Sequence, residues 1–180
     1  EIRFCDWSSD VCSSDLAALL FSWLGDVLLM LQDDNSLFFL LGLSAFLLAH
    51  VFYIFFFHFV RKEENIKSQW WPAMIVVVYY VLMISLLSPY LGEMKLPVRM
   101  YAVVISFMFM LAMHMLFIKN KKAGLWMMVG ALLFVISDSV LAINKFYQSF
   151  EMGGIVVILT YGLAQLFIIK GATRYISRDN

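Results

Sequence analysis

Long apolar runs separated by short polar stretches dominate the chain from residue 17 onward. Six such runs can be read, covering residues 17–31, 37–60, 73–91, 98–118, 123–143 and 153–172. Most are close to the roughly 20 residues that a helix needs to cross a bilayer, and all are too long for the strands of a membrane barrel. In lipid, a helix satisfies its own backbone hydrogen bonds and an open strand does not. The pattern therefore predicts an all-α, polytopic transmembrane helix bundle with six visible helices.

The composition supports a membrane protein and excludes other classes. Of the 180 residues, 63% are hydrophobic and 14% are charged, against about 45–50% and about 25% in soluble domains. Such a chain has too little polar sequence to cover a water-facing surface, and too much apolar sequence to be disordered. The 13 basic and 13 acidic residues cancel, and the basic ones are scattered, so we expect no nucleic acid partner. The lipid bilayer is the expected partner, and the oligomeric state is left open.

Basic residues divide unevenly between the two sets of loops. Cytoplasmic loops carry an excess of Lys and Arg. In the six-helix topology, three basic residues fall on one side, Lys95, Arg99 and Lys145. Nine fall on the other side: Arg61, Lys62, Lys67, Lys119, Lys121, Lys122, Lys170, Arg174 and Arg178. We therefore expect a cytoplasmic C-terminus, and the compact loops favour a bacterial inner (plasma) membrane.

Residues 1–16 differ from the rest of the chain. This segment holds both cysteines and shows no membrane periodicity, and the stretch CDWSSDVCSSDL resembles the conceptual translation of a sequencing-library adapter. We interpret residues 1–16 as an assembly artefact and residues 17–180 as a single transmembrane helical domain. On this interpretation, Cys5 and Cys12 carry no information about redox compartment or metal binding.

Two carboxylates inside apolar runs carry the functional signal. A charged side chain in the bilayer costs at least about 2.5–3.5 kcal/mol, yet Asp26 lies in LGDVLL and Asp138 in VISDSV. Each lies five residues before the outer end of its run, roughly 7–8 Å below the same surface at 1.5 Å per residue. We expect a shared site, the alternative being that each acid caps a neighbouring helix or forms a hydrogen-bonded core contact.

Other polar residues accompany the two acids. His50 lies near mid-membrane, and we expect it to act with the acids, although a lone buried histidine is commonly a core residue. We expect His58 and His114 to be interfacial, near the other ends of their helices, so a zinc site built from the histidines fails on depth, and we expect no metal and no cofactor. Five further residues are candidate substrate contacts: Tyr53, Asn144, Lys145, Tyr161 and Gln165.

Four blocks of the chain carry a family resemblance. FSWLGDVLLML, FLLGLSAFLLAHVFYI, GALLFVISDSVLAINKF and LTYGLAQLFIIKGA occur in this order and resemble the signature blocks of the YhhN family, whose animal members include lysoplasmalogenases. The resemblance covers residues 17 to 172. It implies about eight helices, so residues 1–16 stand where roughly the first two would be, and site residues on those helices cannot be named.

The resemblance implies hydrolysis of the vinyl ether bond of lysophospholipids of the alkenyl type, giving a fatty aldehyde and a glycerophospho-base. That reaction begins with protonation of carbon and continues with attack of water on an oxocarbenium-like cation. It needs one protonated carboxyl group and one ionised one, and two neighbouring acids in a low-dielectric site favour such unequal states. We expect Asp26 and Asp138 to be this pair, with neither assigned as the acid, and Lys145 to hold the phosphate. The alternative is a small proton-coupled transporter or lipid-binding membrane protein.

Overall fold

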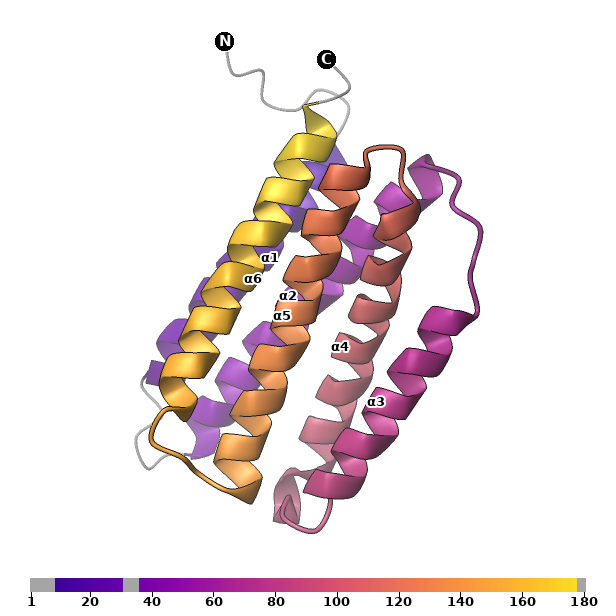
Figure 1. Cartoon of the computed structure of the whole chain (residues 1–180). Helices are drawn as coiled ribbons and strands as arrows, with labels where there is room; N and C mark the ends of the chain where they lie inside the picture. Colours follow the sequence, from indigo (N-terminus) through magenta and orange to yellow (C-terminus); the bar gives the residue numbers. More distant parts are fainter. Residues whose placement is uncertain (1–8, 31–35, 178–180) are drawn as a thin grey trace.

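The structure, a computed structural model, describes residues 9–30 and 36–177 of the chain (Figure 1). These residues form no strand and six α-helices: α1 (Ser9–Met30), α2 (Ser36–Glu63), α3 (Trp71–Leu87), α4 (Lys95–His114), α5 (Lys121–Ala142) and α6 (Gly153–Ile176). Two short 3₁₀ helices, η1 (Gly92–Met94) and η2 (Met115–Phe117), flank α4, and a π-helix, η3 (Ile143–Tyr147), continues α5. The prediction of an all-α chain with six helices is confirmed over these ranges.

Within the described part of the chain, four helical segments are long and apolar enough to cross a membrane: Leu37–Glu63, Gly92–Phe117, Lys121–Tyr147 and Gly153–Ile176. The apolar stretches of α1 (Leu16–Leu28) and α3 are shorter. With 17 residues, α3 is about 26 Å long, less than the ~30 Å hydrocarbon core. It begins part-way along the bundle (Figure 1). Several apolar helices of this length make the chain an integral membrane protein.

Prolines explain two differences between predicted runs and observed helices. The run 73–91 ends as a helix at Leu87, because the ring of Pro89 and its missing N–H do not fit the interior of a helix. Conversely, α4 begins at Lys95, before the predicted start at residue 98, and Pro97 lies in its first turn, where no backbone donor is required.

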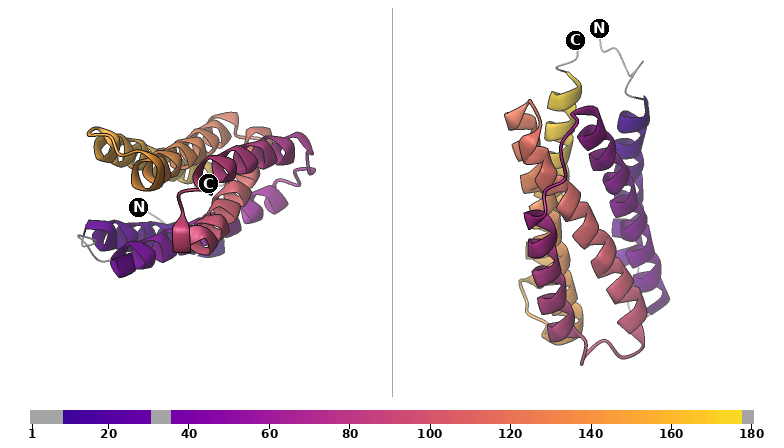
Figure 2. Two further views of the ribbon diagram at one scale, coloured as in Figure 1. Left: turned by 90° about the horizontal axis from the view of Figure 1, so that it is seen from below. Right: turned by 90° about the vertical axis from the view of Figure 1, so that its right-hand side faces the viewer.

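The helices form two layers of three (Figure 2). Helices α1, α2 and α4 form one layer, and α6, α5 and α3 form the other, with α4 also packed against α3 and α5. The basic residues separate as predicted: Arg61, Lys121 and Arg174 lie at helix ends on one side of the bundle, and Lys95 and Lys145 lie on the opposite side (Figure 1). A cytoplasmic location of the first side stays a prediction.

Glycine allows α5 and α6 to pack closely. A Cβ atom on Gly130 would lie 2.8 Å from the carbonyl oxygen of Ala164, and one on Gly171 would lie 2.9 Å from that of Ala123. Small residues at such positions let membrane helices approach backbone to backbone. The two helices thereby form a tight hairpin whose surface toward α1 and α2 carries part of the candidate site.

His114 is the last residue of α4, as its predicted place near a helix end requires, but its side chain is buried inside the protein; its location at the membrane interface stays a prediction. Its side chain is 1% exposed, its Nδ1 contacts the carbonyl oxygen of Met110 at 2.8 Å, and its Nε2 accepts a 3.2 Å hydrogen bond from the backbone N–H of Gln69. The histidine is buried because it holds the α2–α3 connection against the end of α4. His58 is exposed.

Candidate active site

A cavity of about 450 Å³ lies between α1, α2, α5 and α6, within the ~300–1,000 Å³ range of small-molecule sites. Its wall is mostly apolar, and it is lined by Asp26, Ser137, Asp138, Asn144 and Tyr161, together with Phe46, Leu141, Gly154, Val157 and Ile158. The two aspartates come from separate layers of the bundle, and each lies about one turn before the end of its α-helix. The structure therefore places both acids in one intramembrane cavity.

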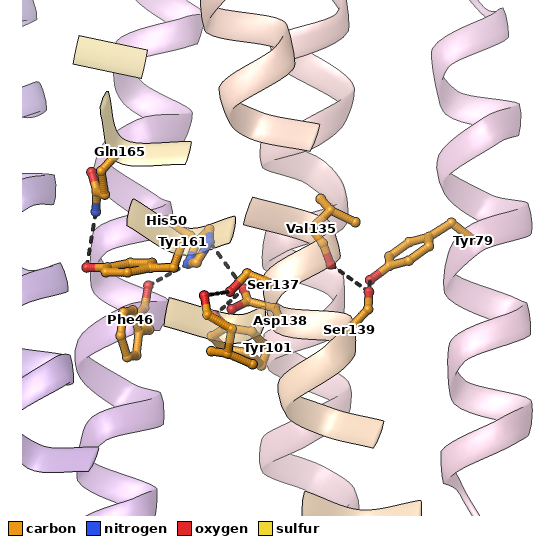
Figure 3. Close-up of polar contacts among 11 residues, drawn as sticks. Phe46, His50, Tyr79, Tyr101, Val135, Ser137, Asp138, Ser139, Tyr161 and Gln165 are labelled. Carbon is orange, nitrogen blue, oxygen red and sulfur yellow. Dashed lines mark hydrogen bonds and ion pairs between the residues drawn. The ribbon is translucent and has the colours of Figure 1, made fainter. Parts of the chain in front are cut away.

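Asp138 is held by two aromatic partners (Figure 3). The hydroxyl of Tyr101 on α4 donates a 2.6 Å hydrogen bond to Oδ2 of Asp138. Nε2 of His50 on α2 lies 3.6 Å from the same oxygen. The side chain of Asp138 is 13% exposed, and it lines the cavity. Both contacts hold the same oxygen, Oδ2, while the residue itself lines the cavity.

His50 is enclosed by aromatic rings and oriented by its own helix. It is 1% exposed and makes edge-to-face contacts with Tyr101 and Phe134, with ring centroids 5.5 and 5.2 Å apart. Its Nδ1 lies 2.6 Å from the carbonyl oxygen of Phe46. Because a carbonyl oxygen only accepts, Nδ1 carries a proton, and the ring is fixed with Nε2 directed at Asp138.

Asp26 belongs to a second hydrogen-bonded chain, which crosses the bundle. Its carboxyl group hydrogen-bonds the side chain of Tyr161 on α6. The amide Nε2 of Gln165 donates to the Tyr161 hydroxyl at 3.3 Å (Figure 3), and the hydroxyl of Tyr53 on α2 donates to Oε1 of Gln165 at 2.5 Å. The chain links a buried tyrosine on α2 to the acid on α1 through two residues of α6.

Two further polar residues build the cavity wall. The hydroxyl of Ser137 donates to the carbonyl oxygen of Val157 at 3.0 Å and ties α5 to α6. Oδ1 of Asn144, in the π-helix, accepts the backbone N–H of Phe150 at 2.9 Å, and Gly153 packs directly against the Asn144 amide. These contacts fix the α5–α6 turn, so this end of the cavity is built before any ligand binds.

Most of the candidate residues predicted from the sequence lie in or beside this cavity, and their roles stay predictions. Asp26, Asp138, Asn144 and Tyr161 line the cavity, and three more stand directly behind its wall: His50, Tyr53 and Gln165. Lys145 does not line it. Its side chain is exposed, and Nζ lies 5.0 Å from the centroid of the Phe39 ring.

Tyr101 was missed by sequence reasoning. It follows Met100 in an apolar run that contains other aromatic residues, and a tyrosine in such a run gives no local sign of its partner. Its buried hydroxyl required one, because a buried Tyr O–H is normally hydrogen-bonded. That requirement was the available signal, and it does not reveal which acid is bound.

The described residues provide no evident set of metal ligands. Over residues 9–30 and 36–177, no group of three His, Cys, Asp or Glu side chains is arranged to hold an ion. The cavity and the side chains behind its wall offer two carboxyl groups, a histidine and phenolic hydroxyls beside an apolar surface.

Fold and site together define a class: a polytopic helical membrane protein with an acidic cavity inside the membrane-spanning bundle. The model of the YhhN family matches residues 6–172, nearly the whole chain, and the protein belongs to the YhhN family. The match and helix α1 (Ser9–Met30) both begin within residues 1–16, and the interpretation of that segment as an artefact stays a prediction. No curated protein and no solved structure matched the chain.

Proposed function

We propose that this protein hydrolyses the vinyl ether bond of lysophospholipids of the alkenyl type, releasing a fatty aldehyde and glycerophosphocholine or glycerophosphoethanolamine. The observation that carries the proposal is the presence of Asp26 and Asp138 in the lining of one cavity within the bundle. Membership of the YhhN family, for which resemblance implies this activity, supports it.

The reaction needs an acid and a base on the same substrate. Protonation of the outer vinyl carbon turns the C=C bond and the ether oxygen into an oxocarbenium-like cation, and water then adds to the carbon next to oxygen. A carboxylic acid can give the first proton, and a carboxylate can stabilise the cation and take a proton from water. Both groups come from the two aspartates of the cavity. Tyr161 and Gln165 orient the water.

The cavity also suits the substrate's shape and polarity. Leu141, Val157 and Ile158 provide an apolar wall for the hydrocarbon chain next to the vinyl ether, while Asn144 lies toward the end of the bundle that carries Lys145. A lipid with a hydrocarbon chain in the bilayer and a phosphate at its surface would bind with its ether bond at the depth of the acids. Lys145 serves as the phosphate contact.

The proposal includes an orientation of the protein in the membrane. The basic end of the bundle faces the cytoplasm of a bacterial inner membrane, with the C-terminus inside, and the cavity lies toward the outer leaflet. This follows from the basic residues at the two ends of the bundle and the excess of Lys and Arg in cytoplasmic loops.

The test uses the purified protein in nanodiscs and a lysophospholipid with a 1-alkenyl chain, with aldehyde release as the readout. We expect turnover of this substrate and none of the 1-alkyl analogue, because a saturated ether has no carbon to protonate. Asp26→Asn and Asp138→Asn should each lower kcat by about 10²–10⁴-fold. Full turnover in both variants would overturn the proposal.

One observation favours a second candidate, a proton-coupled transporter. The contacts from Tyr53 to Asp26 and from His50 to Asp138 are buried polar chains of the kind that carry protons in membrane transporters. Accumulation of a lipid or cation inside vesicles, without aldehyde and dependent on a pH gradient, would establish transport instead.

A further inference from the structure

Two buried histidines in this protein share one local geometry and differ in a single contact. In both His50 and His114, Nδ1 contacts the carbonyl oxygen four residues earlier in the same helix, at 2.6 and 2.8 Å. Nε2 of His114 accepts the backbone N–H of Gln69, so that ring is neutral and its role is structural. Nε2 of His50 has no hydrogen-bond donor among the described residues and lies 3.6 Å from Oδ2 of Asp138.

A lone pair on Nε2 facing a carboxylate oxygen is unfavourable unless a proton lies between them. With Nδ1 already protonated, the pair of His50 and Asp138 is satisfied by one further proton, carried either by the carboxyl group or by the ring. Burial disfavours a lone charge at this place and favours the state in which the pair holds that proton. Asp138 is therefore the acid that carries an exchangeable proton at rest.

Asp26 is hydrogen-bonded to a phenol, as Asp138 is, but among the described residues no histidine is paired with it. Tyr53 donates to the oxygen of the Gln165 amide, and the nitrogen of that amide donates to the Tyr161 oxygen. The Tyr161 proton is therefore left to be donated to Asp26, with which that side chain is hydrogen-bonded. A phenol that donates to a carboxyl group favours the carboxylate, and because Tyr101 donates to Asp138 in the same way, the two acids differ in the His50 ring beside Asp138.

We propose that the two aspartates have fixed and different roles: Asp138, which shares its proton with His50, protonates the substrate, and Asp26 is the ionised partner. The assignment rests on the proposed hydrolysis. His50 and Tyr101 act through Asp138 and are positioning residues.

With these roles, every proton that is transferred in the reaction is accounted for. Asp138 gives its proton to the outer vinyl carbon, and the C=C electrons form that C–H bond. Water then bonds to the cationic carbon and gives a proton to Asp26. In the second step Asp26 returns this proton to the ether oxygen, the C–O bond breaks, and the hemiacetal hydroxyl gives its proton to Asp138 as the aldehyde C=O forms. Both acids regain their starting states, and one water is consumed.

Among residues 9–30 and 36–177, few other titratable groups lie near this pair. The cavity brings Asp26 toward it from α1, and the remaining neighbours are phenols from three helices, Tyr79 on α3, Tyr101 on α4 and Tyr161 on α6. Free phenols ionise near pH 10. Proton exchange between pH 5 and 8 at this site therefore belongs to the histidine and the two acids.

The first experiment compares His50→Gln with His114→Gln across pH 5–9. Glutamine can hydrogen-bond to Asp138 but cannot take up its proton. We expect His50→Gln to lower kcat by less than the about 10²–10⁴-fold of a lost general acid, to leave KM within about twofold, and to change the shape of the pH–kcat profile. His114→Gln should lower thermal stability and leave the profile unchanged. Equal profiles in the two variants would overturn the role of His50.

The second experiment does not depend on turnover, so it separates this assignment from the proposed function. Infrared spectroscopy at pH 7 should show the C=O band of a protonated carboxylic acid inside the membrane. We expect Asp138→Asn to remove this band, Asp26→Asn to retain it, and His50→Gln to shift its frequency. Loss of the band in Asp26→Asn but not in Asp138→Asn would reverse the roles and overturn the proposal. With the expected bands but no aldehyde release, the proton assignment would hold and the hydrolase proposal would fail.

Discussion

Tyr53 on α2 donates a 2.5 Å hydrogen bond to Oε1 of Gln165 on α6, and this contact joins the two layers of the bundle. Both side chains are buried, at 0% and 9% exposure. Because the amide oxygen is engaged by Tyr53, the amide nitrogen is directed at Tyr161. The orientation of the phenol next to Asp26 therefore depends on a residue that does not line the cavity.

Tyr53→Phe removes the donor of this contact and keeps the aromatic ring. The buried Gln165 oxygen then lacks this donor, a loss that costs about 1–3 kcal/mol, and the amide is released to turn its oxygen toward Tyr161. We expect a lower melting temperature together with a fall in kcat. Tyr79→Phe is the matched control, since it removes a 2.9 Å contact with Ser139, and neither residue lines the cavity. It should lower stability with little change in kcat, and an equal loss of kcat in both variants would contradict the role of Tyr53.

The fold could be predicted from the sequence because bilayer physics leaves few alternatives. Apolar runs of about 20 residues become helices in lipid, and two of the differences between the predicted runs and the observed helices occur at Pro89 and Pro97. The π-helix at Ile143–Tyr147 was not predicted. It continues α5 through residues that the hydrophobic pattern assigns to a loop, and it directs Asn144 toward the cavity.

The part of the candidate site that could be predicted from the sequence consists of residues whose burial in a membrane is costly. An intramembrane aspartate or histidine needs a partner, and this requirement singled out Asp26, Asp138 and His50. The partner of Tyr101 and the burial of His114 depend on contacts between segments far apart in sequence. Periodicity along one helix gives a position on its surface, but it does not give the neighbour that the position meets.

A substitution in the close contact between α5 and α6 should lower stability without directly changing the catalytic groups. Gly130→Ala would place a Cβ atom 2.8 Å from the Ala164 carbonyl oxygen and 2.9 Å from the Ile168 nitrogen. Neither backbone atom can move alone, so the helices must separate, at a cost of about 1–3 kcal/mol. Gly162→Ala meets nothing within 4 Å and should leave stability unchanged. Unfolding of both variants in detergent checks the difference, and equal stability would show that the hairpin tolerates separation.

A larger side chain inside the cavity should compete with the substrate for space. Gly154 lines the cavity, and a Cβ atom added to it would meet nothing within 4 Å, whereas Gly162 is equally open but does not line the cavity. Gly154→Leu would extend a side chain into the space next to Ile158. We expect a raised KM for lysophospholipids, greatest for the longest hydrocarbon chains, with the melting temperature close to that of the parent protein. Gly162→Leu should change neither, and a raised KM in that variant would point to a general effect on α6.

Lys145 provides the most direct test of how the headgroup is held. It is exposed beyond the cavity next to Asn144, so its attraction for a phosphate is screened by water and amounts to about 0.2–1 kcal/mol. We expect Lys145→Met to raise KM by about two- to fivefold and to leave kcat unchanged. The difference should shrink at high salt, because mobile ions screen the interaction. Lys95→Met, at the same end of the bundle, is the control.

An alkenyl glycerol without phosphate gives the decisive comparison. Lys145→Met and the parent protein should turn over this substrate with the same KM. A rise of KM for this substrate too would mean that the lysine acts through packing on Phe39 rather than through the headgroup.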